Sequence, residues 1–418
     1  MQILYNLFTY LLFIPFTLYW ILKGIFNTSY LDRLWQRFGL GYKKFKKCIW
    51  IHAVSVGEVQ AVSPLIFTLL EKFPQHKIVI TTVTPTGAHR VNKLFGDSVY
   101  HCYIPFEFPN AIYCFLESIN PLAAMIVETE IWPNLYRGCG IRKIPLILVS
   151  ARISRSSMPR YRKLLPLIRE TLSHGIVIAA QSKADANRFV ELGASNERTH
   201  VIGNIKFDIE IDDKLIKHGK EIRKRFRDRP VWIAASTHEG EEKKILAAHR
   251  MLLKNFPDLL LIIAPRHPER FSRVKDLIKK SSFNLISRSG FEKTDCYEVF
   301  LLDSMGEVTL FFAASDIVFV GGSLVPIGGH NILEPAIQAL PIIIGPYFYN
   351  SEEVVNTFIE DDACVVVEDE TKLATHISAL LYDSAKAKRM GQKGLKIVRK
   401  NKGAIERLIH ILNPILKI

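Results

Sequence analysis

Short apolar runs, many of them rich in β-branched residues, alternate with helix-length segments from residue 48 onward, and this alternation constrains the fold most. Strands of a parallel sheet are buried on both faces, so they read as continuous apolar runs separated by helices. The pattern predicts an α/β protein with two doubly wound, Rossmann-like domains. The predicted strands are Cys48–Val54, Lys77–Val83, Val99–Tyr103, Leu122–Val127, Leu146–Ser150, Ile176–Ala180 and His200–Ile202, then Val231–Ala235, Leu259–Ala264, Phe283–Ile286, Val299–Leu302, Ile317–Val320, Ile342–Ile344 and Cys364–Val367.

The length of 418 residues accommodates two or three domains. We expect the first Rossmann-like domain over residues 25–210 and the second over residues 231–385. The polar segment 211–230, rich in Lys and Arg, is predicted to be a helix plus linker. Residues 386–418 are predicted to form a C-terminal helix that packs across the domains.

The excess positive charge is concentrated in two segments. The chain has 55 Lys and Arg against 41 Asp and Glu, a net charge of +14. Residues 1–50 and 137–169 carry this excess, so two surfaces are expected to meet something anionic. Nucleic acid, phospholipid and a phosphorylated substrate all satisfy this requirement. The six Cys form no C-x-x-C pair, which favours reduced thiols over a disulfide framework or a zinc ribbon.

The N-terminus is unusually apolar. Ile3–Leu22 is long enough, at about 1.5 Å per residue, to span the hydrocarbon of a bilayer, and residues 1–24 are predicted to be a membrane anchor. The Lys and Arg residues that follow place the rest of the chain on the cytoplasmic side. Pro15 and Asn6 keep an interfacial or buried helix open as the alternative.

Several common cofactor and metal motifs are missing. Gly138-Cys139-Gly140 lacks the third glycine of a dinucleotide fingerprint and follows a helical stretch. The chain has no Walker A sequence, no H-E-x-x-H and no Asp-x-Asp. The sequence therefore predicts neither a metal nor a cofactor.

Polar loops follow three strands of the first predicted domain, at the edge where open α/β sheets bind ligands. Ser55-Val56-Gly57-Glu58 follows the first strand, and its glutamate is either a functional carboxylate or a complement to the helix dipole. Glu128-Thr129-Glu130-Ile131-Trp132-Pro133-Asn134 places two carboxylates after an apolar strand, where they favour a functional role. Gly203-Asn204-Ile205-Lys206-Phe207-Asp208 follows the last strand, and its lysine is either functional or a plain surface residue.

The second predicted domain carries a glycine-rich run, Gly321-Gly322-Ser323-Leu324-Val325-Pro326-Ile327-Gly328-Gly329-His330-Asn331-Ile332-Leu333-Glu334-Pro335-Ala336. Paired glycines allow a ligand to approach the backbone closely, and Asn331 is a good helix cap. Free N–H groups at such a helix start would hold a phosphate, while Glu334 could accept ribose hydroxyls. Further polar loops are Ser236–Glu242, Ala264–Arg270 and Met305–Glu307.

The order of these motifs resembles the Kdo transferases of lipopolysaccharide assembly, glycosyltransferase family 30, over nearly the whole chain. The resemblance rests on S-V-G-E, E-T-E-x-W-P-N, G-N-x-K-F-D, A-P-R-H-P-E-R and G-G-H-N-x-L-E-P-A. It implies a GT-B fold and transfer of 3-deoxy-D-manno-octulosonic acid (Kdo) from CMP-Kdo to a lipid A precursor, lipid IVA, beside inner-membrane lipid. Ile332 stands where members commonly have proline, a difference in rigidity more than in chemistry.

The resemblance also implies roles for individual residues. Residues 25–210 would bind the acceptor and residues 231–385 the CMP-sugar. Glu58 would be the general base, with Glu128 and Lys206 as supporting catalytic residues. The donor site would comprise Pro265, Arg266, Met305, Gly306, Glu307, Asn331, Ile332, Leu333 and Glu334. Possible acceptor contacts are Glu130, Arg152, Arg155, Arg160 and Arg162.

Two rival functions remain at this point. One is a membrane-associated GT-B enzyme that uses a UDP-sugar, and the other is a membrane-tethered nucleic-acid-binding protein. The second lacks basic motifs interleaved with aromatics and any recognition helix. The sequence leaves open the number of Kdo residues added, the acceptor's acylation and phosphorylation, and the oligomeric state.

Overall fold

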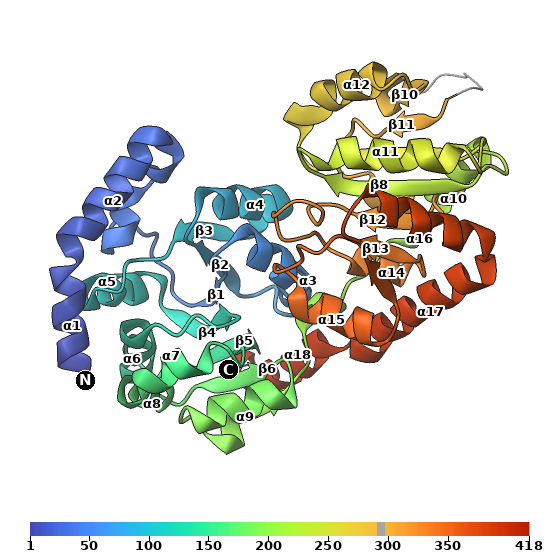
Figure 1. The fold of residues 1–418 in the computed structure, drawn as a ribbon. Helices are drawn as coiled ribbons and strands as arrows, with labels where there is room; N and C mark the ends of the chain where they lie inside the picture. Colours follow the sequence, from blue (N-terminus) through green and yellow to red (C-terminus); the bar gives the residue numbers. More distant parts are fainter. Residues whose placement is uncertain (291–296, 418) are drawn as a thin grey trace. The chain divides into compact units, whose positions relative to one another are not determined.

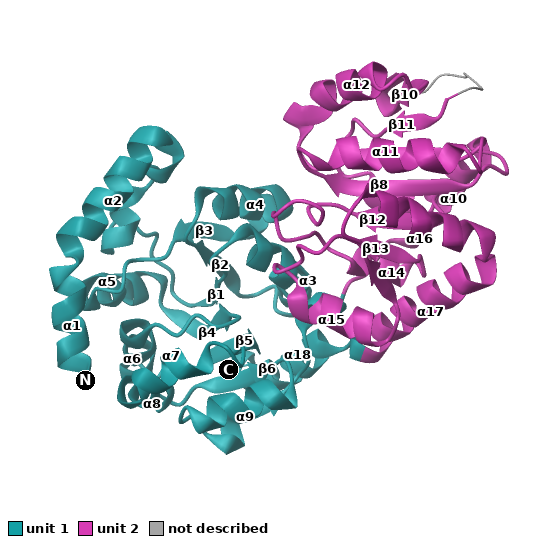
Figure 2. Ribbon diagram, viewed as in Figure 1, with its two compact units in different colours: residues 1–208, 401–418 teal, residues 209–400 magenta. Residues whose placement is uncertain are grey.

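The chain folds into two compact units, which Figure 2 distinguishes by colour. The computed structural model describes residues 1–290 and 297–417. Unit 1 comprises residues 1–208 and 401–418, and unit 2 comprises residues 209–400. Cys296 lies outside the described residues, and the five described cysteines are free thiols.

Unit 1 is built on a seven-stranded parallel sheet of order β3-β2-β1-β4-β5-β6-β7 (Figure 1). Its strands confirm all seven predicted positions, with shifts of one or two residues at some ends. They are β1 (Cys48–His52), β2 (Lys77–Thr82), β3 (Tyr100–Tyr103), β4 (Pro121–Val127), β5 (Leu146–Ala151), β6 (Val177–Ala180) and β7 (Thr199–Val201).

Helices cover both faces of this sheet, because residues of one strand point alternately to the two faces. Trp50 belongs to the core on one face, and its neighbours Ile49 and Ile51 to the core on the other. The helices are α3 (Val56–Lys72), α4 (Pro85–Phe95), α5 (Pro109–Ile119), α6 (Pro133–Ile141), α7 (Met158–Lys163), α8 (Leu165–Leu172) and α9 (Lys183–Glu191), with 3₁₀ turns η3 (Gly96–Ser98), η4 (Asn196–Arg198) and η5 (Ile205–Phe207).

Unit 2 repeats this architecture with the order β10-β11-β9-β8-β12-β13-β14, again parallel. The predicted strands of the second half are confirmed within two residues at each end. They are β8 (Val231–Thr237), β9 (Leu260–Pro265), β10 (Leu285–Ser287), β11 (Val299–Leu301), β12 (Ile317–Val320), β13 (Ile342–Ile344) and β14 (Cys364–Val366). The remaining elements are α10 (Asp213–Arg225), α11 (Glu241–Leu253), α12 (Phe271–Lys280), α13 (Val308–Phe312), α14 (Leu333–Ile337), α15 (Glu352–Glu360), α16 (Glu370–Tyr382), α17 (Ser384–Asn401), η6 (Pro268–Arg270) and η7 (Arg288–Gly290).

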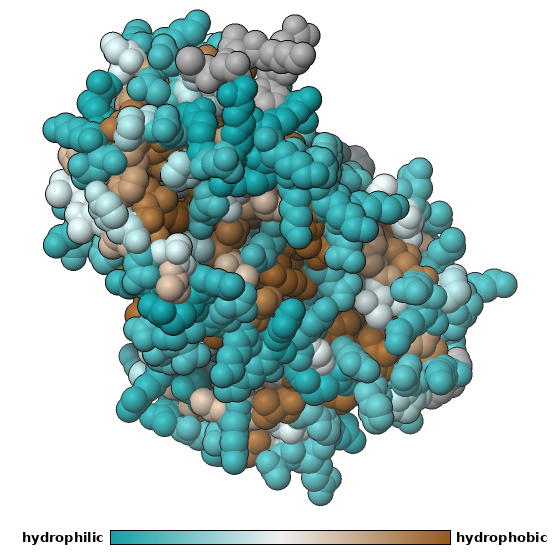
Figure 3. Space-filling model, turned by 90° about the vertical axis from the view of Figure 1, so that its right-hand side faces the viewer, coloured by the Kyte–Doolittle hydropathy of each residue, from teal (hydrophilic) through white to brown (hydrophobic). Residues whose placement is uncertain are grey.

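Hydrophilic side chains cover most of the face shown in Figure 3, and the apolar residues visible there lie between them. This distribution fits sheets whose apolar strands are wholly enclosed by helices. The sheet strands of both units are almost entirely buried, as the continuous apolar runs require.

The C-terminal segment differs from the predicted single helix. It contains α17, which ends at Asn401, and α18 (Ala404–Leu416), which belongs to unit 1. The chain turns at Gly403, where φ is +96°, a conformation that glycine adopts without steric cost. Asp208, the last residue of the first segment of unit 1, accepts the N–H groups of Gly403 and Ile405, both at 2.5 Å. These bonds tie α18 to the end of that segment.

The predicted spanning helix at Ile3–Leu22 is instead two helices, α1 (Gln2–Leu11) and α2 (Phe13–Phe26). They are bent by 46° at Leu12. Within the described residues, no single helix has the length and apolar character to cross a membrane, although the bent pair meets that test together. The short helices η1 (Thr28–Tyr30) and η2 (Leu34–Phe38) follow.

Both N-terminal helices rest on unit 1, beside α5 in Figure 1. Trp20 is 6% exposed and packs with Phe106, Phe108 and Ala111. The guanidinium of Arg37 lies over the Trp20 ring, with its central carbon 3.9 Å from the ring centroid. This contact is a cation–π interaction that fixes α2 to the domain.

Candidate active site

Glu58 lies in the first turn of α3, directly after β1. Its Oε2 accepts the N–H of Val54 at 2.7 Å, and its own N–H donates to the Ser55 hydroxyl at 3.5 Å. Ser55 caps α3, and Glu58 reaches back to the N–H of the residue before the cap, so the helix-terminal role considered from the sequence is present. Burial, aided by the charges of Glu128 and Glu130, raises the pKa of Glu58 to about 7 against the opposing hydrogen bonds of Val54 and Ser55. A carboxyl with this pKa can accept a proton near neutral pH.

Glu128 and Lys206 meet, although 78 residues separate them. Lys206 Nζ donates to Glu128 Oε1 at 3.0 Å, and both side chains are about 30% exposed. Glu128 has a positive φ of +60°, a strained conformation for a residue with a Cβ and one that clusters at functional sites. Lys206 is held by Asn204, whose Oδ1 accepts the Lys206 N–H at 3.0 Å. The structure therefore brings two of the three predicted catalytic residues into contact.

Glu130 lies in the same loop as Glu128 and is oriented by aromatic neighbours. Trp132 Nε1 donates to Glu130 Oε2 at 2.7 Å, and the Tyr136 hydroxyl donates to the Glu130 carbonyl at 2.9 Å. Burial raises the pKa of Glu130, with a further contribution from Glu128. The edge of Trp132 meets the ring of His52, a fully buried histidine of β1, at 5.5 Å between centroids. Three carboxylates thus share one end of the unit 1 sheet.

The four arginines predicted as acceptor contacts differ in their surroundings. The Arg152 carbonyl accepts a hydrogen bond from Thr129, which connects it to the acidic loop. Arg155 and Arg160 are exposed. Arg162 instead pairs with Glu191 on α9, at 2.5 Å between Nη2 and Oε1. Of the four, Arg152 is therefore the one for which a hydrogen bond to the acidic loop, residues 128–132, is described.

In unit 2, Glu241 organises the glycine-rich loop that follows β12. This glutamate is 0% exposed. Its carboxylate accepts four backbone N–H groups, from His238 (2.8 Å), Gly322 (2.7 Å), Ser323 (3.0 Å) and Leu324 (2.9 Å). Four charge-assisted hydrogen bonds compensate the cost of burying the carboxylate and fix the course of the loop. The neighbouring Glu242 forms a bidentate ion pair with Arg270, at 2.7 and 3.0 Å.

Three histidines gather above this loop. His238 Nε2 and His330 Nε2 are 2.8 Å apart, and their rings stack with 5.0 Å between centroids. His267 meets His238 edge-on at 5.3 Å. Burial, together with the neighbouring histidines and the Arg266 charge, lowers the pKa of His330 to about 3. The pKa of His238 is lowered as well, chiefly by burial, so this stacked pair provides polar groups without adding charge at neutral pH.

The predicted donor residues all lie at the carboxyl ends of unit 2 strands, but most of their polar groups have protein partners. Glu307 pairs with Arg288, with the closest approach 2.9 Å, which lowers the pKa of Glu307. Glu334 accepts Asn331 Nδ2 at 3.2 Å and the Thr309 hydroxyl at 3.0 Å. Asn331 Oδ1 already accepts the Leu333 N–H at 3.0 Å, and α14 has five residues. Asn331 therefore caps this helix start as predicted, which occupies the Leu333 N–H, and the phosphate site at the other amides stays a prediction.

Other predicted donor residues remain available to a ligand. Pro265 is buried at the end of β9, Arg266 beside it is exposed, and Met305 is 47% exposed. Gly306 has φ +88°, which shapes the turn before α13. By contrast, Ile332 and Leu333 are only 1% and 2% exposed, so their side chains are not open to a ligand. Thr309, at the start of α13, connects the Met305–Glu307 turn to Glu334.

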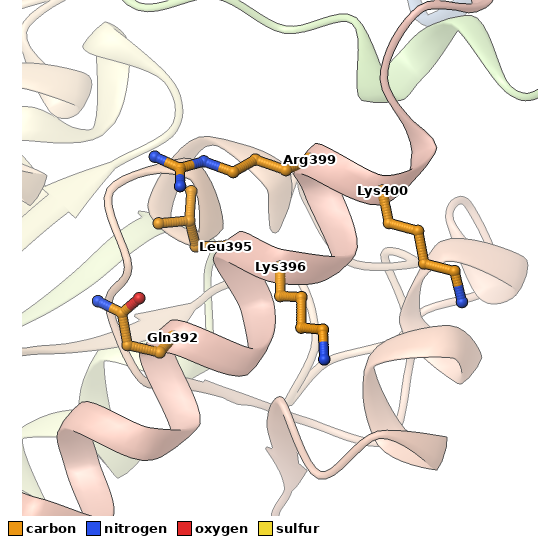
Figure 4. A pocket seen from close by; sticks show the side chains of 5 residues that line it. All are labelled: Gln392, Leu395, Lys396, Arg399 and Lys400. Atoms are coloured by element: carbon orange, nitrogen blue, oxygen red, sulfur yellow. The ribbon is translucent and has the colours of Figure 1, made fainter.

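The hollows found in the structure lie elsewhere. One, of about 410 Å³, is lined by Gln392, Leu395, Lys396, Arg399 and Lys400 of α17 (Figure 4). Another, of about 460 Å³, lies beside α10 and includes Arg288. Neither contains a predicted site residue, so we rest the assignment on the strand-end residues.

Sequence reasoning missed Glu107, Glu241 and the paired histidines. The sequence did show Glu241 and His238 in one loop, but nothing in it indicated that four amides would converge on that glutamate. Glu107 precedes a helix in an ordinary loop. The paired acidic sequence Glu241-Glu242, in the polar segment that follows a predicted strand, was the available signal.

Comparisons with known proteins decide the family. Residues 32–209 match the family model for 3-deoxy-D-manno-octulosonic-acid transferase. The chain is 40% identical over 404 residues to a 3-deoxy-D-manno-octulosonic acid transferase of Haemophilus influenzae, covering 95% of this chain and 94% of that protein. This chain belongs to the Kdo transferase family. A Bordetella pertussis member of the family is 31% identical over 378 residues, with 87% and 86% covered.

Membership in the Kdo transferases makes the chain a glycosyltransferase and sets aside the nucleic-acid-binding alternative. The fold agrees with this assignment. A solved UDP-GlcNAc 2-epimerase from Neisseria meningitidis, 16% identical, superposes with a TM-score of 0.57 over 88% of this chain and all of that one. At this identity the likeness shows the fold alone, a pair of parallel-sheet α/β domains of GT-B type.

Proposed function

We propose that this Kdo transferase moves Kdo from CMP-Kdo to lipid IVA at the cytoplasmic surface of the inner membrane, by an inverting displacement that needs no metal. The family assignment supports Kdo transfer, and the observation that carries the mechanism is Glu58, a carboxylate with a pKa near 7 at the end of β1. The finer points, namely donor, acceptor, stereochemistry and metal independence, belong to the proposal.

In this mechanism Glu58 takes the proton from the acceptor hydroxyl. The hydroxyl oxygen then forms a bond to the anomeric carbon of Kdo as the bond between that carbon and the CMP phosphate oxygen breaks. One displacement of this kind inverts the anomeric centre. A base matched to the working pH gives the best compromise between being ionised and being basic.

Fixed charges meet the anions of the reaction. Lys206, held by Glu128 at 3.0 Å, is the proposed partner of the Kdo carboxylate or of an acceptor phosphate. Arg266 and the loop held by Glu241 are the proposed partners of the departing CMP. Arg152, Arg155 and Arg160 extend the positive charge available to acceptor phosphates.

The N-terminal helices support work at a membrane surface. Ile3, Leu11 and Phe26 are 86%, 74% and 90% exposed. Lys23 and the basic residues of segment 33–47 follow them. An apolar face flanked by basic residues partitions into an interface that contains anionic lipid.

Mass spectrometry of the lipid after incubation with CMP-Kdo and tetra-acylated lipid IVA tests this function. We expect one or more Kdo additions, with equal yield after exhaustive chelation of divalent metals. Isothermal titration with CMP and with UDP separates the proposal from the UDP-sugar alternative, because we expect binding of CMP only. Binding of UDP with no product from CMP-Kdo would contradict the proposal.

A further inference from the structure

Helix α1 has two sides of opposite character. Ile3, Leu7 and Leu11 recur at helical spacing and are 86%, 66% and 74% exposed. Gln2 and Tyr5, three residues apart, face unit 1, and Gln2 is only 6% exposed. A helix that served only as an anchor would need no buried polar contacts with the domain.

These two polar residues reach the interior of unit 1. Tyr5 Oη donates to Glu107 Oε2 at 2.9 Å. Gln2 Nε2 donates to Asn134 Oδ1 at 2.6 Å. Asn134 in turn donates through Nδ2 to the Glu107 carbonyl at 2.8 Å. The four side chains form one hydrogen-bonded network between α1 and the start of α6.

Glu107 supplies the N-terminal cap of α6. Its Oε2 accepts the Asn134 N–H at 2.9 Å and its Oε1 accepts the Leu135 N–H at 2.8 Å. The residue before the helix is Trp132, whose side chain has only a donor and cannot accept these amides. A carboxylate from another segment at first-turn amides stabilises and orients the helix.

The start of α6 is also the end of the acidic loop. Trp132 donates to the Glu130 carboxylate at 2.7 Å, and Tyr136 of α6 donates to the Glu130 carbonyl at 2.9 Å. A displacement of the first turn of α6 therefore moves the groups that hold Glu130, and Glu128 lies two residues earlier in the same loop.

We propose that Gln2 and Tyr5 are positioning residues, which couple the seating of the membrane-facing helix α1 on unit 1 to the placement of the acidic loop Glu128–Trp132. The lipid surface is then more than a place of attachment, because a bilayer that receives the apolar side of α1 holds its polar side against Glu107 and Asn134. This inference rests on the proposed function, since it states that the turnover of that reaction depends on how α1 packs against the rest of unit 1.

Hydrogen exchange tests the coupling without relying on activity. The full chain is labelled with and without vesicles of phosphatidylethanolamine and phosphatidylglycerol. Exchange is then read out on the proteolytic fragment that spans residues 128–136. In wild type we expect vesicles to slow exchange of the Asn134 and Leu135 amides. In the Gln2→Ala/Tyr5→Phe variant we expect faster exchange, with no effect of vesicles. Identical exchange in both proteins would overturn the proposal.

Kinetics with a detergent-dispersed acceptor give the second test, because local concentration at a bilayer then plays no part. We expect Gln2→Ala/Tyr5→Phe to lower kcat about three- to tenfold at nearly unchanged donor KM, as the loss of one or two hydrogen bonds allows. Tyr10→Phe is the matched control on the same helix, since Tyr10 stacks on Phe108 and should keep wild-type kcat. Leu7→Ser should weaken vesicle binding and leave this kcat unchanged.

Equal losses for Tyr10→Phe and for the double variant would overturn the proposal, because they would indicate general loosening of α1. A wild-type kcat in the double variant would make α1 an anchor only. A wild-type enzyme that transferred no Kdo would instead disprove the proposed function, while the exchange experiment would still decide whether α1 and α6 are coupled.

Discussion

The carboxyl ends of the two sheets both collect glutamates, but they use them differently. In unit 1, Glu58 and Glu130 have raised pKa values because burial disfavours ionisation, as do the charge of Glu128 on both and that of Glu130 on Glu58. In unit 2, Glu242 and Glu307 form ion pairs with arginines, and Glu241 accepts four backbone amides. The same edge of the same kind of sheet therefore carries potential proton acceptors in one unit and structural carboxylates in the other.

The difference shows that position after a strand does not assign a role to a glutamate. What assigns it is the number of donors that the neighbouring chain brings to the carboxylate. A saturated carboxylate holds a loop, whereas one left short of partners is available for chemistry. We therefore expect substitutions in unit 1 to affect turnover and substitutions in unit 2 to affect donor binding.

The largest effect is expected for Glu58→Gln. Gln can still accept the Val54 N–H but cannot accept the acceptor's proton, so single-turnover rate should fall about 10²- to 10⁴-fold while CMP affinity stays unchanged. Glu71→Gln, at the exposed far end of α3, is the matched control and should behave as wild type. Near-normal turnover in Glu58→Gln would leave it a helix cap and transfer the role of base to Glu128 or Glu130.

The pH dependence sharpens the same comparison. The base must be ionised, so turnover should rise with pH and level off above about 7, the pKa of Glu58. Folding stability should change in the opposite sense. The pKa of Glu58 is raised from 4.5 on folding. Its contribution to the free energy of unfolding is therefore complete below pH 4.5 and is lost as the pH rises to about 7. Thermal unfolding of Glu58→Gln across this range should lack that loss.

Glu241→Gln should have the next largest effect, and it should fall on unit 2. The amide cannot accept four N–H groups as a carboxylate does, so the loop at Gly322–Leu324 should loosen. We expect about 1.5–3 kcal/mol less stability and about tenfold weaker CMP binding by titration. Glu239→Gln, exposed in the same loop, is the control. Unchanged CMP affinity would separate this loop from the donor.

Arg266→Ala should weaken CMP binding about tenfold by loss of one charge-assisted contact, with little change in stability because the side chain is exposed. Arg273→Ala on α12 is a matched exposed control. Glu334→Ala should weaken CMP binding to a similar degree, and it should also release Asn331 and Thr309. If both Arg266 and Glu334 variants bind CMP normally, the nucleotide lies elsewhere.

The smallest effect is expected at the N-terminus. Phe26 is 90% exposed, so Phe26→Ser should change stability by less than about 0.5 kcal/mol. Flotation with anionic vesicles should nevertheless show weaker binding, because a large apolar side chain no longer enters the interface. Thr28→Ser is a matched control on the adjacent exposed turn. Undiminished flotation of Phe26→Ser would show that α2 does not enter the lipid.

Deletion of residues 1–22 is a less clean test than the sequence suggests. We still expect the truncated chain to bind CMP, because the donor residues belong to unit 2, and to transfer poorly in bilayers. The deletion also uncovers Phe106, Phe108 and Ala111, which pack against Trp20. Point substitutions on the exposed side of the helices avoid this exposure of core.

Local pattern predicted the sheets almost completely. The strands were marked by short apolar runs between helix-length segments, so the ends of β1 to β14 were predicted within two residues. The bend at Leu12 was missed, although Pro15 has no N–H to donate to the carbonyl of Leu11, where α1 ends. The break before Gly403 was missed as well, although a glycine after a basic last turn is a common helix end.

The candidate site was predicted in part. Glu58, Glu128 and Lys206 were found by motif, and their loops do lie at one edge of one sheet. The cap predicted at Asn331 is confirmed, and because its side chain occupies the Leu333 N–H, a phosphate at this helix start would have to use other amides. A cap and a phosphate compete for the same donors, and the sequence does not say which one has them.

The sequence by itself determined the two parallel sheets, the polar loops at their carboxyl ends and the family, because these depend on periodicity and on short local motifs. Only the tertiary structure decided which carboxylate is saturated with hydrogen-bond donors and which keeps acceptor capacity for a substrate. That outcome depends on donors from distant segments, such as Lys206 reaching Glu128, the amides of Gly322 and Leu324 reaching Glu241, and Tyr5 reaching Glu107. Hydrogen bonds and desolvation act through space, so the properties of each glutamate follow from what the fold brings beside it.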